Sequence, residues 1–168
     1  MTILALTKAH QSQVQQLFND VDFFSAEWFS SPKQLFFSVF TQDHELTTVA
    51  HIELYHNVMI LKALTTSKAY RNQGVARKLL KHTEHLAQKL GCDMIYAFTR
   101  YGANYLECAG FEQTIRSRLP LQLVDYMTNH QLNHSTIMKR KVELSKKHLM
   151  RQEQKALQTQ MPLSHLVA

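Results

Sequence analysis

The strongest constraint on the fold of this chain is a long amphipathic helix pattern enclosed by two glycines. The small and apolar positions on its one face are Ala76, Leu79, Leu80, Thr83, Leu86, Ala87 and Leu90. Gly74 precedes the pattern, and Gly91 follows it where a C-terminal cap is expected. Apolar runs at residues 58–65 and 94–98 stand on either side. This order predicts a β–α–β unit whose two strands are parallel neighbours.

The remaining segments predict strands and short helices around that unit. Strands are expected at residues 35–40, at 48–55, from Phe111 onward and at 135–142. Helices are expected at residues 9–20, 23–29, 102–108 and 120–127. An antiparallel meander followed by alternating strands and helices predicts an α/β fold. We expect a mixed twisted sheet of about six to seven strands with flanking helices.

Length and composition fit one globular domain. The chain has 168 residues, of which 45% are hydrophobic and 19% charged, so it can bury a substantial core. No apolar run is long enough for a transmembrane helix, and the first residues do not resemble a signal peptide. The two cysteines form neither a disulfide framework nor a metal-binding spacing. We therefore expect a cytoplasmic protein with no metal and no membrane partner.

Positive charge gathers near the C-terminus. Residues 139–155 carry seven lysines and arginines against two glutamates, and the whole chain has a net charge of +6. The segment could bind nucleic acid or another anionic surface, or it could be a solvated helix face. We favour the second interpretation and expect no nucleic-acid partner, because no aromatic residues alternate with the charges. We divide the chain into a domain at 1–142 and a basic, helical extension at 143–168. The extension's apolar residues would dock on the domain or on a second subunit, so a homodimer is possible.

The segment between the first strand and the long helix suits an anion. A glycine in Arg71–Ala76 lets a ligand approach the backbone closely. The free N–H groups of a helix's first turn and the positive end of its dipole attract anions such as a diphosphate. Arg71 and Arg77 add positive charge. An ordinary strand-to-helix turn is the alternative interpretation.

Together these segments resemble the GNAT superfamily of N-acetyltransferases. Arg71-x-x-Gly74-x-Ala76 resembles the family's Gln/Arg-x-x-Gly-x-Gly/Ala loop, and residues 105–111 resemble its aromatic-Tyr-Glu-x-x-Gly-Phe segment. The resemblance covers roughly residues 35–142 and implies a GNAT fold with acetyl-CoA as co-substrate. It places the cofactor against Leu64, Thr65, Thr66, Arg71, Asn72, Gln73, Gly74, Val75, Ala76 and Arg77.

A narrower resemblance concerns the substrate. Residues 36–39, 52–55 and 61–64 look similar to the acetyltransferase domains of N-acetylglutamate synthases and to arsenic-resistance-associated acetyltransferases. This resemblance implies acetyl transfer to a primary amine of a small molecule such as an amino acid. Two features favour an alternative, an acetyl-CoA-binding regulatory module with little or no catalysis. Leu106 stands where the family often has a tyrosine that acts as the general acid. Residues 131–135 stand where the narrower group has a Cys-Pro-Ser-rich segment.

The resemblance also implies how catalysis would proceed. The backbone N–H groups of Leu64 and Thr65 would stabilise the developing oxyanion. The amine must lose a proton, and we take Glu53 as the first candidate base. His51 and His56 are alternatives, because histidine titrates near neutral pH. Two further assignments stay open: Lys62 could bind a substrate carboxylate, and Tyr105 could be an acid or a packing aromatic.

Overall fold

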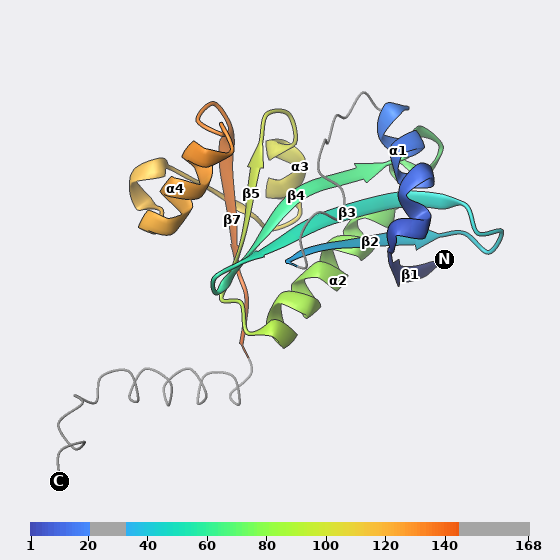
Figure 1. Ribbon diagram of the computed structural model, residues 1–168, viewed down its shortest axis with the longest axis horizontal. Coiled ribbons are helices and arrows are strands. Elements are labelled where there is room, and N and C mark those ends of the chain that lie inside the picture. Colours follow the sequence, from blue (N-terminus) through green and yellow to red (C-terminus); the bar gives the residue numbers. More distant parts are fainter. Residues whose placement is uncertain (21–32, 145–168) are drawn as a thin grey trace, which may run out of the picture.

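The computed structural model (Figure 1) describes residues 1–20 and 33–144. Its strands are β1 (Thr2–Ala5), β2 (Gln34–Phe40), β3 (Leu46–Tyr55), β4 (Val58–Thr66), β5 (Met94–Thr99), β6 (Glu112–Thr114) and β7 (Thr136–Lys141). Its α-helices are α1 (Gln11–Asn19), α2 (Val75–Leu90), α3 (Ala103–Cys108) and α4 (Leu121–Asn129). Short 3-10 helices are η1 (Lys8–His10), η2 (Lys68–Tyr70) and η3 (Arg116–Arg118). The expected helix at 23–29 and the extension from residue 145 onward lie outside the described residues.

The strands form one mixed sheet of seven strands in the order β1-β2-β3-β4-β5-β7-β6. Strands β4 and β5 are parallel neighbours joined through α2, and the other recorded pairings are antiparallel. The predicted β–α–β unit and the α/β mixed sheet are therefore confirmed. Strand β1 was not predicted, because its side chains are mostly exposed and lack a buried alternating pattern.

Helices cover both faces of the sheet (Figure 1). Because successive strand residues point to opposite faces, Met59 and Leu61 of β4 pack in one core with α2. Val58 and Ile60 point the other way and pack with α4. A third core, which includes Ala63 of β4, lies under α1 on this second face. The fold thus places α2 on one side of β4, and α1 and α4 on the other.

Helix α2 buries most of its predicted face, and the most exposed position of that face is at the C-terminal end. Leu79, Thr83 and Ala87 are fully buried, whereas Leu90 is 49% exposed. Gly91 ends the helix in the left-handed conformation, as the sequence predicts for a C-terminal cap. In the part of the chain that the structure describes, no helix has the length and apolar character needed to span a bilayer.

Candidate functional site

The central feature of the site is the divergence of two parallel strands. Pairing between β4 and β5 runs from Val58–Met94 to Leu61–Ala97 and stops there, although β4 continues to Thr66. At the same point β4 bulges against β3, because Ile52 pairs with Leu61 and His51 pairs with Ala63. Lys62 is the extra residue of the bulge, and a bulge bends and twists its strand.

This divergence exposes a stretch of strand backbone. Among the described strands, only β3 pairs with β4 beyond Leu61. Peptide groups on the other edge of residues 64–66 can therefore meet a ligand in place of a neighbouring strand. Successive N–H groups of a strand point to opposite edges, and Ser67 donates its N–H to Thr47 of β3. The N–H of Thr65 therefore faces its partner Val49 on β3, and the prediction that it stabilises an oxyanion does not fit this geometry. Leu64, for which the same role was predicted, has its N–H on the open edge. The geometry makes that role possible, and the role itself stays a prediction.

The predicted anion-binding loop follows this edge directly. Gly74 is the N-cap of α2 in the left-handed conformation (φ 74°), and Asn72 also has a positive φ of 61°. A side chain added at Gly74 would meet nothing within 4 Å, so the space over the loop is open. No acidic residue occupies the first turn of α2. An anion can therefore reach the N–H groups of this turn.

Side-chain hydrogen bonds hold the loop in shape. The Nε of Arg71 donates to the carbonyl of Thr66 over 3.2 Å, which ties the loop to the end of β4. The Tyr70 hydroxyl donates to Glu45 over 2.6 Å, and this hydrogen bond raises the pKa of the tyrosine. The tyrosine thus links η2 to the turn before β3. Sequence reasoning missed this contact, because its partner lies in a distant turn.

A second group of candidate functional residues lies on the α4 side of the sheet. The Glu53 carboxylate of β3 is 3.2 Å from the Lys62 ammonium of β4, and their side chains are 15% and 22% exposed. The hydroxyl of Tyr126 on α4 donates to the same carboxylate oxygen over 2.9 Å. We call Glu53, Lys62 and Tyr126 the acceptor cluster. The sequence suggested the first two residues, but no local motif indicated the tyrosine.

Aromatic packing fixes Tyr126. Its side chain is 2% exposed and lies against Tyr55, with ring centroids 5.0 Å apart, and against His130, at 4.0 Å. A buried tyrosine hydroxyl requires a hydrogen-bond partner, and here Glu53 supplies it. The carboxylate is therefore held in one place by a rigid neighbour.

The two alternative bases differ from Glu53. His51 is buried and stacks on Phe36, with centroids 4.0 Å apart. Burial and the positive charge of Lys62 lower the pKa of His51 to about 3, so it is too weak a base at neutral pH. The expectation that His51 titrates near neutral pH is therefore wrong. His56 is an exposed residue of the β3–β4 turn with a φ of 54°.

The residues of α3 point in different directions. Leu106 is 5% exposed and packs in the α2 core, so it is structural. Tyr105 is 44% exposed. Burial raises the pKa of Tyr105, and the positive charge of Arg77 partly offsets this shift. Tyr105 therefore lies near Arg77 at the beginning of α2, on the side of the predicted cofactor loop. The described residues hold no group of three or more histidine, cysteine or acidic side chains placed to bind a metal.

Comparison with known structures shows the same fold. The chain is similar to an N-acetylglutamate synthase from Neisseria gonorrhoeae in complex with coenzyme A and N-acetyl-glutamate, at TM-score 0.71 and 15% identity. That match covers 85% of this chain but 36% of the synthase, so this chain spans about a third of its length. An acetyltransferase of the GNAT family from Staphylococcus aureus Mu50 matches at TM-score 0.67 and 16% identity, over 84% of this chain and 99% of the other.

A third similar structure is the ribosomal-protein-S18-alanine N-acetyltransferase from Escherichia coli. It matches at TM-score 0.63 and 18% identity, over 86% of this chain and 95% of the other. The comparison with curated protein sequences finds no match. The family model described as "Acetyltransferase (GNAT) family" matches residues 4–111. This chain therefore belongs to the acetyltransferase (GNAT) family.

Proposed function

We propose that this chain is an N-acetyltransferase of the cytoplasm, which moves the acetyl group of acetyl-CoA to the primary amine of a small molecule such as an amino acid. One observation carries the proposal. The paired charges of Glu53 and Lys62 stand at the bulge where β4 leaves β5. Partly buried opposite charges next to an open strand edge suit a substrate that carries both an ammonium and a carboxylate.

The cofactor would enter from the α2 side. The N–H groups of Arg71–Ala76 and the positive charge of Arg77 would hold its diphosphate. The acetyl carbonyl would then lie on the open edge of β4. There the N–H group of Leu64 would stabilise the negative charge that develops on its oxygen.

The amine would enter from the α4 side and meet Glu53. The carboxylate takes a proton from the ammonium, directly or through a water, and the free amine attacks the thioester carbon. The nitrogen of the tetrahedral intermediate loses a second proton to water, and the intermediate collapses with cleavage of the C–S bond, giving the neutral amide and the coenzyme A thiolate. Lys62 and Tyr126 both contact the Oε2 atom of Glu53, which leaves Oε1 to accept from the substrate.

Lys62 gives a reason to prefer amino acids among amines. When the ammonium of a substrate approaches Glu53, the lysine can turn to the substrate's carboxylate and keep both charges paired. The structure of the Neisseria gonorrhoeae synthase with N-acetyl-glutamate provides an analogy for such an acceptor. The analogy concerns the class of acceptor and does not identify a particular amino acid.

The alternative function is an acetyl-CoA-binding regulatory module with little catalysis. The buried Leu106 favours it, because leucine cannot supply the proton that a tyrosine there would give to the departing thiolate. The thiol of coenzyme A has a pKa near that of free cysteine, about 8.5. It can therefore leave as the thiolate, so the enzyme interpretation does not require that proton.

Release of coenzyme A thiol from acetyl-CoA in the presence of a panel of amines tests the proposal. The panel should contain amino acids, their amides, diamines and short peptides, with mass spectrometry of each product. We expect turnover with at least one amino acid and weaker turnover with its amide. Lys62→Met should remove that difference, whereas Lys141→Met on the exposed end of β7 should preserve it. Binding of acetyl-CoA without acetyl transfer to any amine would favour the regulatory module.

A further inference from the structure

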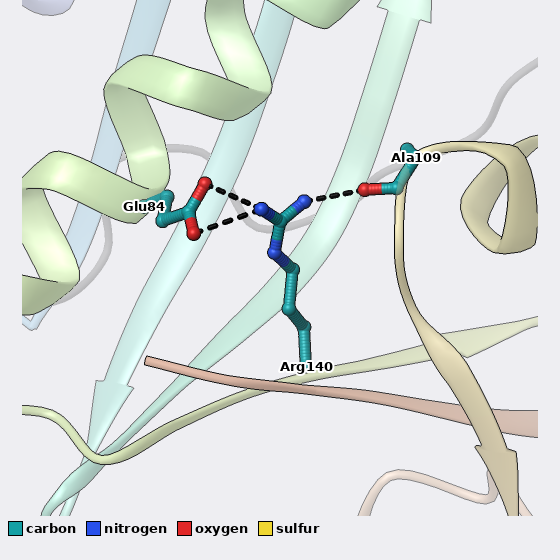
Figure 2. Close-up of polar contacts among 3 residues, drawn as sticks. All are labelled: Glu84, Ala109 and Arg140. Atoms are coloured by element: carbon teal, nitrogen blue, oxygen red, sulfur yellow. Dashed lines mark hydrogen bonds and ion pairs between the residues drawn. The ribbon is translucent and has the colours of Figure 1, made fainter. Parts of the chain in front are cut away.

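Arg140 of β7 contacts both α2 and the C-terminal end of α3, and both helices lie far from Arg140 in the sequence (Figure 2). Its Nη2 atom lies 2.8 Å from both carboxylate oxygens of Glu84 on α2. Its Nη1 atom donates to the carbonyl of Ala109 at the C-terminal end of α3. The side chains of Arg140 and Glu84 are 29% and 31% exposed, so solvent screens this ion pair only in part.

The end of α3 is shaped to receive the guanidinium group. Ala109 is the C-cap of α3, where backbone carbonyls face out of the helix and favour a cation. Gly110 follows in the left-handed conformation, with a φ of 86°. A side chain added at Gly110 would come within 3.3 Å of the arginine Nη1 atom. The turn after α3 is therefore closely fitted to Arg140.

Helix α3 shares a hydrophobic core with α2, whose N-terminus follows the predicted cofactor loop. Leu106 of α3 packs in the same core as Val75 and Leu79 from the first turns of α2. Burial raises the pKa of Tyr105 on α3, and the positive charge of Arg77 near the start of α2 partly offsets this shift. A change in the position of α3 would therefore reach the residues beside the cofactor.

We propose that Arg140 is a positioning residue that fixes the spacing between α2 and α3 and so the width of the cofactor site. The inference rests on the proposed function, because it assumes that coenzyme A lies at the start of α2. The planar guanidinium group of arginine donates in two directions from one rigid fork. Lysine offers one flexible ammonium and cannot hold Glu84 and Ala109 in the same geometry. Charge alone is therefore not sufficient for this role.

The test measures coenzyme A binding by calorimetry and steady-state kinetics on the full chain. Arg140→Met should weaken coenzyme A binding about tenfold, since it removes charge-assisted hydrogen bonds on both sides. The KM for acetyl-CoA should rise by a similar factor, while kcat at saturation changes less than about twofold. The coenzyme A affinity of Arg140→Lys should lie between that of Arg140→Met and that of the wild type. Lys141→Met is the matched control, since it removes an exposed cation from the same strand.

Thermal unfolding separates this role from a purely structural one. If Arg140→Met or Arg140→Lys unfolds at a lower temperature but binds coenzyme A as the wild type does, the positioning role is wrong. If Arg140→Met does not fold, the coenzyme A affinity and unfolding temperature of Arg140→Lys provide the same test, because the lysine keeps the positive charge. Failure of the wild type to bind coenzyme A would instead overturn the proposed function, and the positioning role with it.

Discussion

The cofactor region and the acceptor cluster are built in different ways. Residues 64–77 form the first, and they follow one another along the chain from the end of β4 to the start of α2. The acceptor cluster takes one side chain each from β3, β4 and α4. In the proposed function, the first region presents backbone groups to acetyl-CoA, and the second presents side chains to the acceptor substrate. We therefore expect the two regions to respond differently to mutation.

The chemistry should be most sensitive in the acceptor cluster. Glu53→Gln removes the proposed base but keeps the shape of the side chain. We expect kcat near neutral pH to fall by about 10² to 10⁴, the usual contribution of general acid–base catalysis. The loss should shrink at higher pH, where more of the amine is already unprotonated. Initial rates of thiol release between about pH 7 and pH 9.5 measure both effects.

Glu112→Gln provides the control for that prediction. Glu112 also lies on a strand, β6, but its side chain is exposed. The control should retain full activity over the same pH range. A Glu53→Gln enzyme with wild-type rates at every pH would remove the base from the acceptor cluster and would leave binding as its only role.

Burial of His51, next to the acceptor cluster, should make stability depend on pH. Its pKa is lowered to about 3 in the folded state, against the ordinary 6.5 when unfolded. Between these values the unfolded chain binds a proton that the folded chain does not, so folding is destabilised as the pH falls. At about pH 4.5 this costs the wild type about 3 kcal/mol.

His51→Phe keeps the ring stacked on Phe36 and removes the titration. The stability of wild type and variant should therefore diverge as the pH falls below about 6.5, with the variant losing less. Urea unfolding at several pH values measures how the free energy of unfolding of each protein changes with pH. Parallel curves would mean that His51 is not buried as a neutral ring, and the acceptor face would then be more open than described.

The cofactor loop should be sensitive through its backbone. Gly74 has a φ of 74°, where an L-residue is strained by roughly 1 to 2 kcal/mol. A methyl group there would also occupy the open space above the loop. Gly74→Ala should weaken coenzyme A binding about tenfold or more, with little change in kcat at saturation. Calorimetric titration with coenzyme A measures the first effect.

Gly91→Ala is a matched control for Gly74→Ala. Gly91 ends the same helix with a φ of 75°, so the same substitution introduces the same backbone strain far from the loop. Both variants should lose stability, but only Gly74→Ala should lose affinity for coenzyme A. Equal loss of affinity in both would mean that the loop acts only through the stability of α2.

The contrast between the two regions also explains what could be predicted from the sequence. The cofactor loop, α2 and the parallel strands are local patterns, because helix periodicity and glycine caps lie within a few residues of each other. The resemblance then placed residues 64–66 and 71–77 at the cofactor. Glu53 and Lys62 were suggested singly, as a candidate base and a possible carboxylate ligand.

The contacts between distant residues could not be predicted in this way. The hydrogen bond from Tyr126 to Glu53 joins residues 73 positions apart, and that between Arg140 and Glu84 joins residues 56 apart. Such contacts depend on strand order and on the face to which each side chain points. The bulge that moves Lys62 out of register likewise has no local signature in the sequence.

The smallest expected effect concerns Tyr105, the one hydroxyl of α3 that lies on the cofactor side. Burial raises its pKa, so the phenol is protonated at neutral pH and could donate to the departing thiolate. The thiolate needs little help, however, since its conjugate acid has a pKa of about 8.5. Tyr105→Phe should therefore change kcat by less than about threefold, as should Tyr101→Phe at the 97% exposed neighbouring position. Thiol release at saturating substrates measures both variants.

A fall in kcat of about 10² or more for Tyr105→Phe alone would assign proton transfer to the cofactor region as well. The division between a binding region and a chemical region would then be wrong.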